Sequence, residues 1–288
     1  MPELAGVEHR FVELPGLRMH IAMAGAGEPV VLLHGWPQHW WAWRHLIPAL
    51  AERYRVICPD QRGFGWSDAP PVGYAKDQLA TDIVQLLDKL GHQRVRLVGH
   101  DWGGFIGFLI CLRHPERVER YLALNTAHPF PRGDARTLAA LSRLWFQPLI
   151  ATPRLGPRLV GSPRQRFVRW LLDSGNVDES VWSGQDTELY LAQLREPARA
   201  RASSLLYRTF LMHELLPGLR GHYKQLRLRT PTLFLHGTGD PTLHPALLRG
   251  FEPYADDLTL ELVDGVGHFI ADERPELVAD RAREFFAR

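Results

Sequence analysis

The hexapeptide Gly99-His100-Asp101-Trp102-Gly103-Gly104 decides the fold of this 288-residue chain. It follows the apolar run Val95-Arg96-Leu97-Val98 and opens an apolar stretch with helical character that ends near His114-Pro115. The three glycines allow the strand and helix backbones to approach closely at a sharp turn. We therefore predict a strand-turn-helix elbow with Asp101 at its apex, at a helix N-terminus where the dipole favours negative charge.

Outward from this hexapeptide, short apolar runs alternate with turn signals and helical stripes. Strands are predicted at 30–33, 55–60, 95–98, 121–124, 231–236 and 258–263, and helices at 79–90 and 275–286. Such alternation is typical of a parallel sheet with helices on both faces. From Phe130 to about Arg220, helical stripes replace the strand pattern. We predict an α/β core formed by residues 1–129 and 221–288 and interrupted by a helical cap at residues 130–220.

The composition excludes several classes of protein. With 45% apolar residues and a formal net charge of +2, the chain is neither disordered nor a typical nucleic-acid binder. The two cysteines, Cys58 and Cys111, form no CxxC pair, which indicates a reducing compartment. The sequence shows no secretory leader and no apolar run of the roughly 20 residues that span a bilayer. We expect a cytoplasmic globular protein, monomer or homodimer, that binds a small molecule and neither nucleic acid nor membrane.

An aspartate at the elbow apex restricts the chemistry. A carboxylate attacks amides and esters weakly, but it suits displacement at a saturated carbon that carries a good or strained leaving group. The product is an alkyl-enzyme ester, whose hydrolysis needs a base to activate water. The structural alternative for Asp101 is a helix N-cap. No histidine or cysteine ligand cluster predicts a metal, and Gly25-Ala26-Gly27 lacks the following helix of a dinucleotide site. No cofactor is therefore expected.

His268 is expected to be this base, because it lies just past the last predicted strand. Asp240 directly follows the penultimate predicted strand, at the carboxyl edge where ligand sites form in α/β sheets. The order nucleophile, acid, histidine along the chain is the order found in triads on such sheets. Three other aspartates remain open as the acid: Asp134, Asp264 and Asp272.

The tetrapeptide His34-Gly35-Trp36-Pro37 predicts an oxyanion hole. Pro37 fixes its own φ and biases Trp36 toward extended backbone. The backbone N–H groups of Trp36 and Trp102 then face the carbonyl of an ester on Asp101. We expect His34 to hold this loop by hydrogen bonds, and Trp36 and Trp102 to line the substrate pocket.

Taken together, these motifs resemble the α/β-hydrolase fold in its epoxide hydrolase and haloalkane dehalogenase branch. Trp40-Trp41-Ala42-Trp43-Arg44 and the turn Asp60-Gln61-Arg62-Gly63-Phe64-Gly65 are most similar to bacterial epoxide hydrolases. The resemblance covers almost the whole chain and is thinner in the cap. It implies a mostly parallel sheet flanked by helices, with the helical cap inserted after strand 6. It also implies conversion of an epoxide and water to a vicinal diol.

In the cap, the resemblance implies two tyrosines whose O–H groups protonate the leaving epoxide oxygen. Tyr207 matches the second of them. At the first position this chain offers Phe146 or, in another register, Ser142, and neither is a tyrosine. Tyr207 then acts alone, or the indole N–H of Trp145 or a water supplies the second donor. We expect the pocket to be lined by Trp36, Trp102, Trp145, Phe146 and Phe269.

Haloalkane dehalogenase is the alternative function. It keeps Asp101, Asp240 and His268 and holds the halide with Trp102 and a second N–H donor, for which Trp145 is the candidate. A fluoroacetate-type dehalogenase carries arginines just after the nucleophile, where this chain has Trp102 and Phe105. A serine esterase needs a serine at the elbow. A non-catalytic binding protein on this fold has no need of a complete triad.

Overall fold

The computed structural model describes residues 1–178 and 180–288. One eight-stranded sheet has the order β1-β2-β4-β3-β5-β6-β7-β8. Strands β3 to β8 pair in parallel, whereas β1 and β2 form an antiparallel hairpin that continues antiparallel onto β4. The strands are β1 (Glu8–Leu14), β2 (Leu17–Ala24), β3 (Glu28–Leu33), β4 (Tyr54–Pro59), β5 (Val95–His100), β6 (Val118–Leu124), β7 (Thr232–Gly237) and β8 (Leu258–Val263).

The predicted mostly parallel sheet is confirmed, and the β1–β2 hairpin is an addition that the apolar runs did not indicate. Strand β1 lies at the edge of the sheet, and most of its residues are exposed or half-buried. An edge strand with few buried side chains has no continuous apolar run to mark it. Strands β3 to β7 are largely buried and therefore stand out in the sequence.

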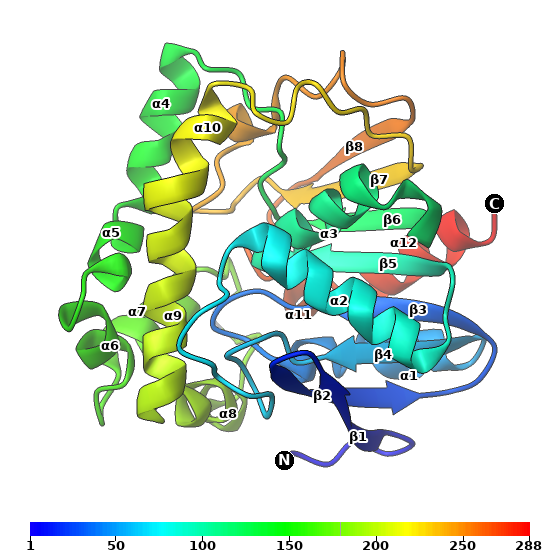
Figure 1. The fold of residues 1–288 in the computed structure, drawn as a ribbon, viewed down its shortest axis with the longest axis horizontal. Helices are drawn as coiled ribbons and strands as arrows, with labels where there is room; N and C mark the ends of the chain where they lie inside the picture. The colour runs from blue at the N-terminus through cyan, green and yellow to red at the C-terminus, as the bar shows by residue number, and fades with distance from the viewer. Residues whose placement is uncertain (179) are drawn as a thin grey trace.

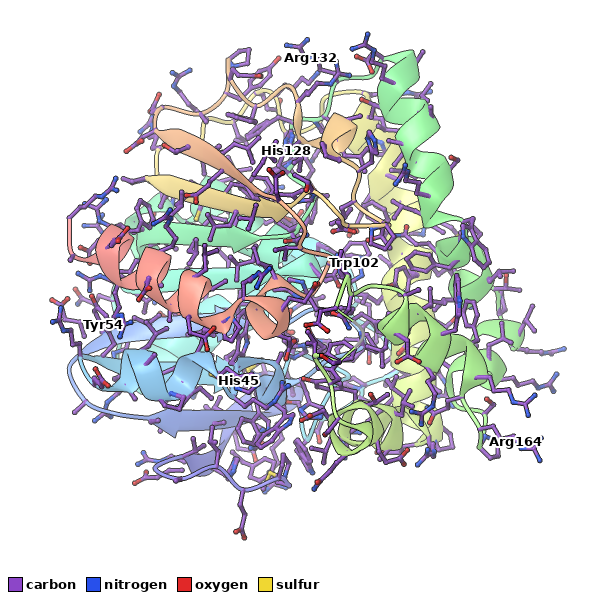
Figure 2. All side chains as sticks on the ribbon, turned by 180° about the vertical axis from the view of Figure 1, so that it is seen from behind. His45, Tyr54, Trp102, His128, Arg132 and Arg164 are labelled. Carbon is purple, nitrogen blue, oxygen red and sulfur yellow. The ribbon has the colours of Figure 1, made fainter. Side chains whose placement is uncertain are left out.

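Helices cover both faces of the sheet, as Figures 1 and 2 show from opposite sides. Helices α2 (Lys76–Leu90) and α3 (Asp101–Arg113) contribute buried side chains to the larger apolar core, on one face. Helices α1 (Leu46–Ala51) and α12 (Pro275–Phe286) contribute to the core on the other face. Among the described residues, no helix is both long and apolar enough to cross a membrane.

The chain between β6 and β7 forms the helical cap, beside the sheet in Figure 1. This confirms the predicted helical insertion after strand 6. Helix α9 packs against α5 and α6 and continues through a π-helical turn, Phe210–Glu214, into α10. The cap helices are α4 (Ala135–Leu141), α5 (Phe146–Ala151), α6 (Leu155–Val160), α7 (Arg166–Asp173), α8 (Gly184–Leu194), α9 (Pro197–Thr209) and α10 (Leu215–Leu219).

Gly103 gives a direct test of the close packing between α3 and the sheet. A Cβ at this position would lie 2.2 Å from the carbonyl oxygen of Leu33 and 2.4 Å from that of His34. Both are backbone atoms that cannot rotate away. We expect Gly103→Ala to lower the free energy of unfolding by about 1–3 kcal/mol, the usual cost of overpacking, as measured by urea unfolding. Gly184→Ala is the control, because its Cβ would meet nothing within 4 Å; equal losses in both variants would contradict the packing argument.

Candidate active site

Asp101 is the first residue of α3 and directly follows β5. Its φ is +50°, in the left-handed region that residues other than glycine rarely adopt. A Cβ at Gly99 would lie 2.6 Å from the carbonyl oxygen of Gly103, so the close approach requires glycine there. The structure therefore has the elbow that the hexapeptide predicts, with Asp101 at the apex. Backbone strain of this kind clusters at functional sites.

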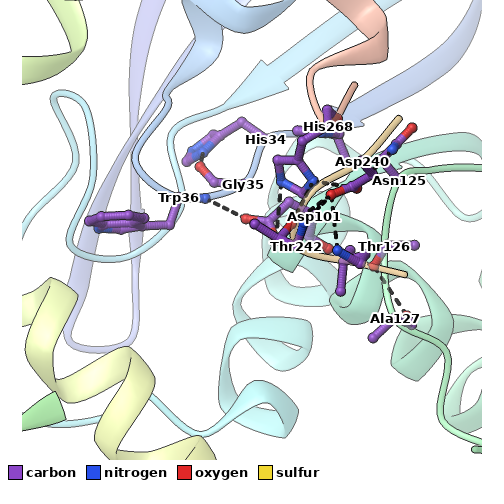
Figure 3. Close-up of polar contacts among 12 residues, drawn as sticks. His34, Gly35, Trp36, Asp101, Asn125, Thr126, Ala127, Asp240, Thr242 and His268 are labelled. Atoms are coloured by element: carbon purple, nitrogen blue, oxygen red, sulfur yellow. Dashed lines mark hydrogen bonds and ion pairs between the residues drawn. The ribbon is translucent and has the colours of Figure 1, made fainter. Parts of the chain in front are cut away.

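The Asp101 carboxylate is held by backbone donors (Figure 3). The N–H of Trp36 donates to Oδ2 at 2.9 Å, and the N–H of Trp102 also hydrogen-bonds to the carboxylate. The Thr126 hydroxyl donates to the Asp101 carbonyl oxygen at 2.7 Å and fixes the strained backbone. Burial raises the pKa of Asp101 to about 6, although His268 and the two N–H groups oppose the shift. At neutral pH the side chain is thus an ionised but poorly solvated carboxylate.

The loop that carries Trp36 is fixed from below by His34. Its Nε2 accepts a hydrogen bond from the backbone N–H of Gln61 at 3.0 Å. Its Nδ1 then carries the proton and donates to the carbonyl oxygen of Gly35 at 2.9 Å. Burial lowers the pKa of His34, which keeps the ring neutral. His34 is a hydrogen-bonding support of the loop, as expected.

His268 and Asp240 lie beside Asp101. His268 Nδ1 is 2.8 Å from Asp240 Oδ2, and His268 Nε2 is 3.9 Å from Asp101 Oδ1. Burial alone would lower the pKa of His268, but the two carboxylates outweigh it and raise this pKa to about 9. Burial would likewise raise the pKa of Asp240, yet His268 and several hydrogen bonds hold it well below its usual range. Asp240 therefore stays ionised and holds the imidazole with Nε2 toward Asp101.

Two residues that the sequence analysis did not single out support this pair. Asn125 Nδ2 donates to Asp240 Oδ2 at 2.9 Å and to the Gly267 carbonyl oxygen at 3.1 Å. The backbone N–H and hydroxyl of Thr242 donate to Asp240 Oδ1 at 2.8 and 2.7 Å. Asn125 directly follows β6 with φ +32°. Its place after a parallel strand, at the edge where ligands bind, is the signal that could have identified it.

The other aspartates that were open as the acid have different partners. Asp134 accepts from the backbone N–H of Thr137 at 2.9 Å, which caps α4, and pairs with Arg249 at 2.7 Å. Asp272 pairs with buried Arg44, and Asp264 accepts from the Thr238 hydroxyl at 3.3 Å. Of these four aspartates, only Asp240 lies within hydrogen-bond distance of the His268 ring.

Two cavities meet at Asp101. Trp36, Phe146, Tyr207 and Phe269 line one of them, together with His268. Trp102 lines the other, which is mainly apolar. The Tyr207 ring is 5.4 Å from the Trp36 ring and 5.5 Å from the Trp102 ring, both edge to face. Burial and the Asp101 carboxylate raise the pKa of Tyr207, so its phenol stays protonated.

Trp145 does not line either cavity, so its predicted place in the pocket is wrong. Its side chain is 51% exposed and packs beside Phe167 and Trp170 on the outer side of the cap. At the start of α5 successive side chains point to different sides, and Phe146 takes the inward position. Ser142 is also exposed and donates to the Ala139 carbonyl oxygen at 2.7 Å. Neither residue therefore supplies a hydrogen-bond donor to the cavities.

Gln147 is a further pocket residue that the sequence analysis missed. Only 8% of the residue surface is exposed, and the side chain lines both cavities together with Asp101. In the part of the chain that the structure describes, its side-chain amide has no hydrogen-bond partner. The amide faces the two cavities, so it is available to hydrogen-bond to a polar group of a bound molecule. Nothing in the local sequence around Phe146 distinguishes a glutamine that lines the pocket from one with a purely structural role.

Comparisons with known proteins agree with this geometry. A family model described as alpha/beta hydrolase fold matches residues 28–275. A soluble epoxide hydrolase from Corynebacterium sp. (strain C12) is 32% identical over 295 residues, which cover 98% of this chain and 98% of that protein. Epoxide hydrolase 4 from Mus musculus is 31% identical over 274 residues, which cover 91% of this chain and 74% of that protein. The solved structure of the epoxide hydrolase CorEH without ligand has a TM-score of 0.85 at 32% identity and covers 98% of this chain and 99% of its own.

The ion pair between His268 and Asp240 predicts a specific change in titration. Asp240→Asn removes the carboxylate 2.8 Å from Nδ1, and we expect the pKa of His268 to fall from about 9 by roughly 1–3 units, the usual effect of a close opposite charge. NMR titration of isotopically labelled histidine measures it. Asp134→Asn is the matched control, and a larger fall in that variant would show that the acid has been misplaced.

Proposed function

Because the chain belongs to the alpha/beta hydrolase family, we propose that it is an epoxide hydrolase that converts an epoxide and water to a vicinal diol. The observation that carries this proposal is the half-buried carboxylate of Asp101 at the elbow apex, 3.9 Å from His268. A serine there would indicate an esterase, whereas a carboxylate suits displacement at saturated carbon. The relatives whose names describe them as epoxide hydrolases support the same activity.

In the first half-reaction, Asp101 opens the epoxide. Oδ1 is the attacking atom, because Oδ2 already accepts the N–H of Trp36. Oδ1 forms a bond to an epoxide carbon while the carbon–oxygen bond of the ring breaks. The Tyr207 hydroxyl transfers its proton to the leaving oxygen, which becomes the first hydroxyl of the diol. Oδ2 becomes the ester carbonyl oxygen and remains in the oxyanion hole formed by the N–H groups of Trp36 and Trp102.

In the second half-reaction, water hydrolyses this ester. The ester on Asp101 is uncharged, so one of the two carboxylates that raise the pKa of His268 is lost and the ring gives up its proton. The neutral Nε2 then takes a proton from water, whose oxygen attacks the ester carbonyl carbon. Negative charge then develops on Oδ2, beside the N–H of Trp36. Collapse breaks the bond between Oδ1 and Cγ of Asp101. Oδ1 leaves as the second hydroxyl oxygen of the diol, and the water oxygen remains in the restored Asp101 carboxylate. The two protons of water go to the released diol oxygen and to the Tyr207 phenolate, so that the enzyme returns to its starting state.

The geometry favours an epoxide over a carbon–halogen bond. A halide leaves without a proton but needs N–H donors that point into the pocket. Trp145 is on the outer side of the cap, and the Trp36 indole N–H already donates to the Ser203 hydroxyl at 2.9 Å. Trp145, the second halide donor expected of a haloalkane dehalogenase, therefore lies outside the two cavities. An epoxide hydrolase needs a proton donor for the leaving oxygen, and the buried phenol of Tyr207 in the same cavity as Asp101 can supply the proton.

Gln147 takes the place of the second donor in this proposal. Its amide N–H hydrogen-bonds to the epoxide oxygen while Tyr207 transfers the proton. A neutral amide stabilises developing negative charge but does not give up its proton at neutral pH. Tyr207 and Gln147 therefore contribute differently to the same step.

Intact-mass spectrometry tests the nucleophile and the leaving group together. His268→Gln should still be alkylated by styrene oxide but should not hydrolyse the ester, because no base activates water. We expect a stable adduct with the full mass of the epoxide, located on Asp101 by peptide mapping. Asp101→Ala should give neither adduct nor turnover. An unshifted mass at saturating epoxide, with an adduct that has lost hydrogen halide when a bromoalkane is supplied, would favour the dehalogenase.

The two cap donors should differ in their effect on the alkylation step. Tyr207→Phe should slow alkylation by on the order of 10²-fold or more, as for loss of a general acid. Gln147→Leu should slow it by about tenfold, because one hydrogen bond to the transition state is lost. Stopped-flow tryptophan fluorescence under single-turnover conditions measures both rates. A normal alkylation rate in the phenylalanine variant would reject Tyr207 as the acid.

A further inference from the structure

Lys76, which the reaction scheme does not use, is fully buried at the start of α2. Its Nζ donates to the carbonyl oxygen of Leu206 at 2.6 Å and lies 3.1 Å from Oε2 of Glu214. Its backbone N–H donates to Oε1 of the same glutamate at 2.8 Å. Lys76 belongs to the core, whereas Leu206 and Glu214 belong to the cap. This one side chain therefore joins the core to the cap helix that carries Tyr207.

The same ammonium group also contacts the aromatic wall of the site. Nζ lies 4.7 Å from the Trp102 ring centroid and 5.4 Å from that of Phe210, both within cation–π range. The Trp102 ring in turn packs edge to face against Tyr207. Leu206 is the residue that precedes Tyr207 in α9. Lys76 is thus linked to Tyr207 in two ways. It binds the backbone carbonyl of the preceding residue, Leu206, and it contacts the Trp102 ring, which packs against the Tyr207 phenol.

Stability alone does not account for a lysine in this position. Removing an ammonium group from water is unfavourable unless its partners compensate. Here burial lowers the pKa of Lys76 to about 8 although Glu214 acts to raise it, so the partners compensate only in part. Apolar side chains in place of a buried ion pair are often neutral or stabilising. The contacts of Lys76 therefore point to a role in geometry.

We propose that Lys76 is a positioning residue for Tyr207, holding the Leu206 carbonyl and the Trp102 ring so that the phenol faces the leaving oxygen. This inference rests on the proposed function, in which Tyr207 is the acid. Lys76 does not contact the substrate. It acts only on the half-reaction that needs the Tyr207 proton, so ring opening depends on it and ester hydrolysis does not.

Lys76→Met tests this role, because methionine has a similar length and no charge. We expect alkylation by styrene oxide to slow by about tenfold while ester hydrolysis stays within about twofold, since only one step uses the acid. The unfolding midpoint should fall, because Glu214 is left without its charge partner. Arg62→Met is the matched control: Arg62 forms a buried ion pair with Asp82, also on α2, at 2.7 Å. The Arg62→Met substitution should lower the unfolding midpoint and leave the alkylation rate unchanged.

A double-mutant cycle separates positioning from a general structural effect. If Lys76 acts through Tyr207, Lys76→Met should change the alkylation rate by less than about twofold in a Tyr207→Phe background. A full tenfold loss there would overturn the proposal, as would a normal alkylation rate in the single Lys76 variant. If Tyr207→Phe alone alkylates normally, the acid role fails and the positioning role fails with it. The single-variant rates thus distinguish the two failures.

A second variant keeps the test decisive if Lys76→Met does not fold. Glu214→Gln retains the volume of the side chain and removes the charge partner of Nζ. We expect it to slow alkylation in the same direction, by a factor smaller than that of the methionine variant, and to have no further effect when Tyr207 is phenylalanine. Normal alkylation in a folded Glu214→Gln protein, or an undiminished loss in the phenylalanine background, would overturn the proposal.

Discussion

The close contact between α3 and the central strands is the constraint on which the rest of the structure depends. Where Gly103 passes over β3 there is no space for a side chain, and the backbone of Asp101 must adopt a left-handed conformation. This conformation directs the carboxylate away from the sheet and toward the N–H of Trp36. The histidine, its acid and the cap are then arranged around a group whose position the backbone has already determined.

Two carboxylates, one buried and one half-buried, flank one imidazole, and their surroundings give them opposite character. Asp240 accepts hydrogen bonds from Asn125 and Thr242 as well as His268, and its pKa is lowered. Asp101 has fewer donors, and burial dominates, so its pKa is raised. A carboxylate with a raised pKa is poorly stabilised as an anion and is the better nucleophile. The charge of His268 and the hydrogen bonds to Asp240 outweigh its burial, whereas burial prevails at Asp101. This difference separates the proposed supporting acid from the proposed nucleophile.

The sequence predicts most of this arrangement, because buried parallel strands and the glycine-rich elbow leave strong local patterns. Asp101, Asp240 and His268 follow predicted strands and meet at one edge of the sheet, as expected. The cap was less predictable. Trp145 and Phe146 are neighbours with similar composition, and only the packing of α5 determines which of them faces inward. Gln147, Asn125 and Lys76 act through contacts with residues distant in the chain, which no local pattern records.

The π-helical turn at Phe210–Glu214 has a consequence for how this cap tolerates changes in length. A π-helical turn is an α-helix that has gained one residue. Loss of a single residue from this turn would restore regular α-helical winding and leave the helix beyond it facing nearly the same way, because the wider turn absorbs one extra residue. Helix α10 would keep its direction, and the change would fall on the turn itself, where Phe210 and Glu214 line the apolar cavity. Homologous caps that differ by one residue here would therefore enclose differently shaped cavities around an unchanged catalytic elbow.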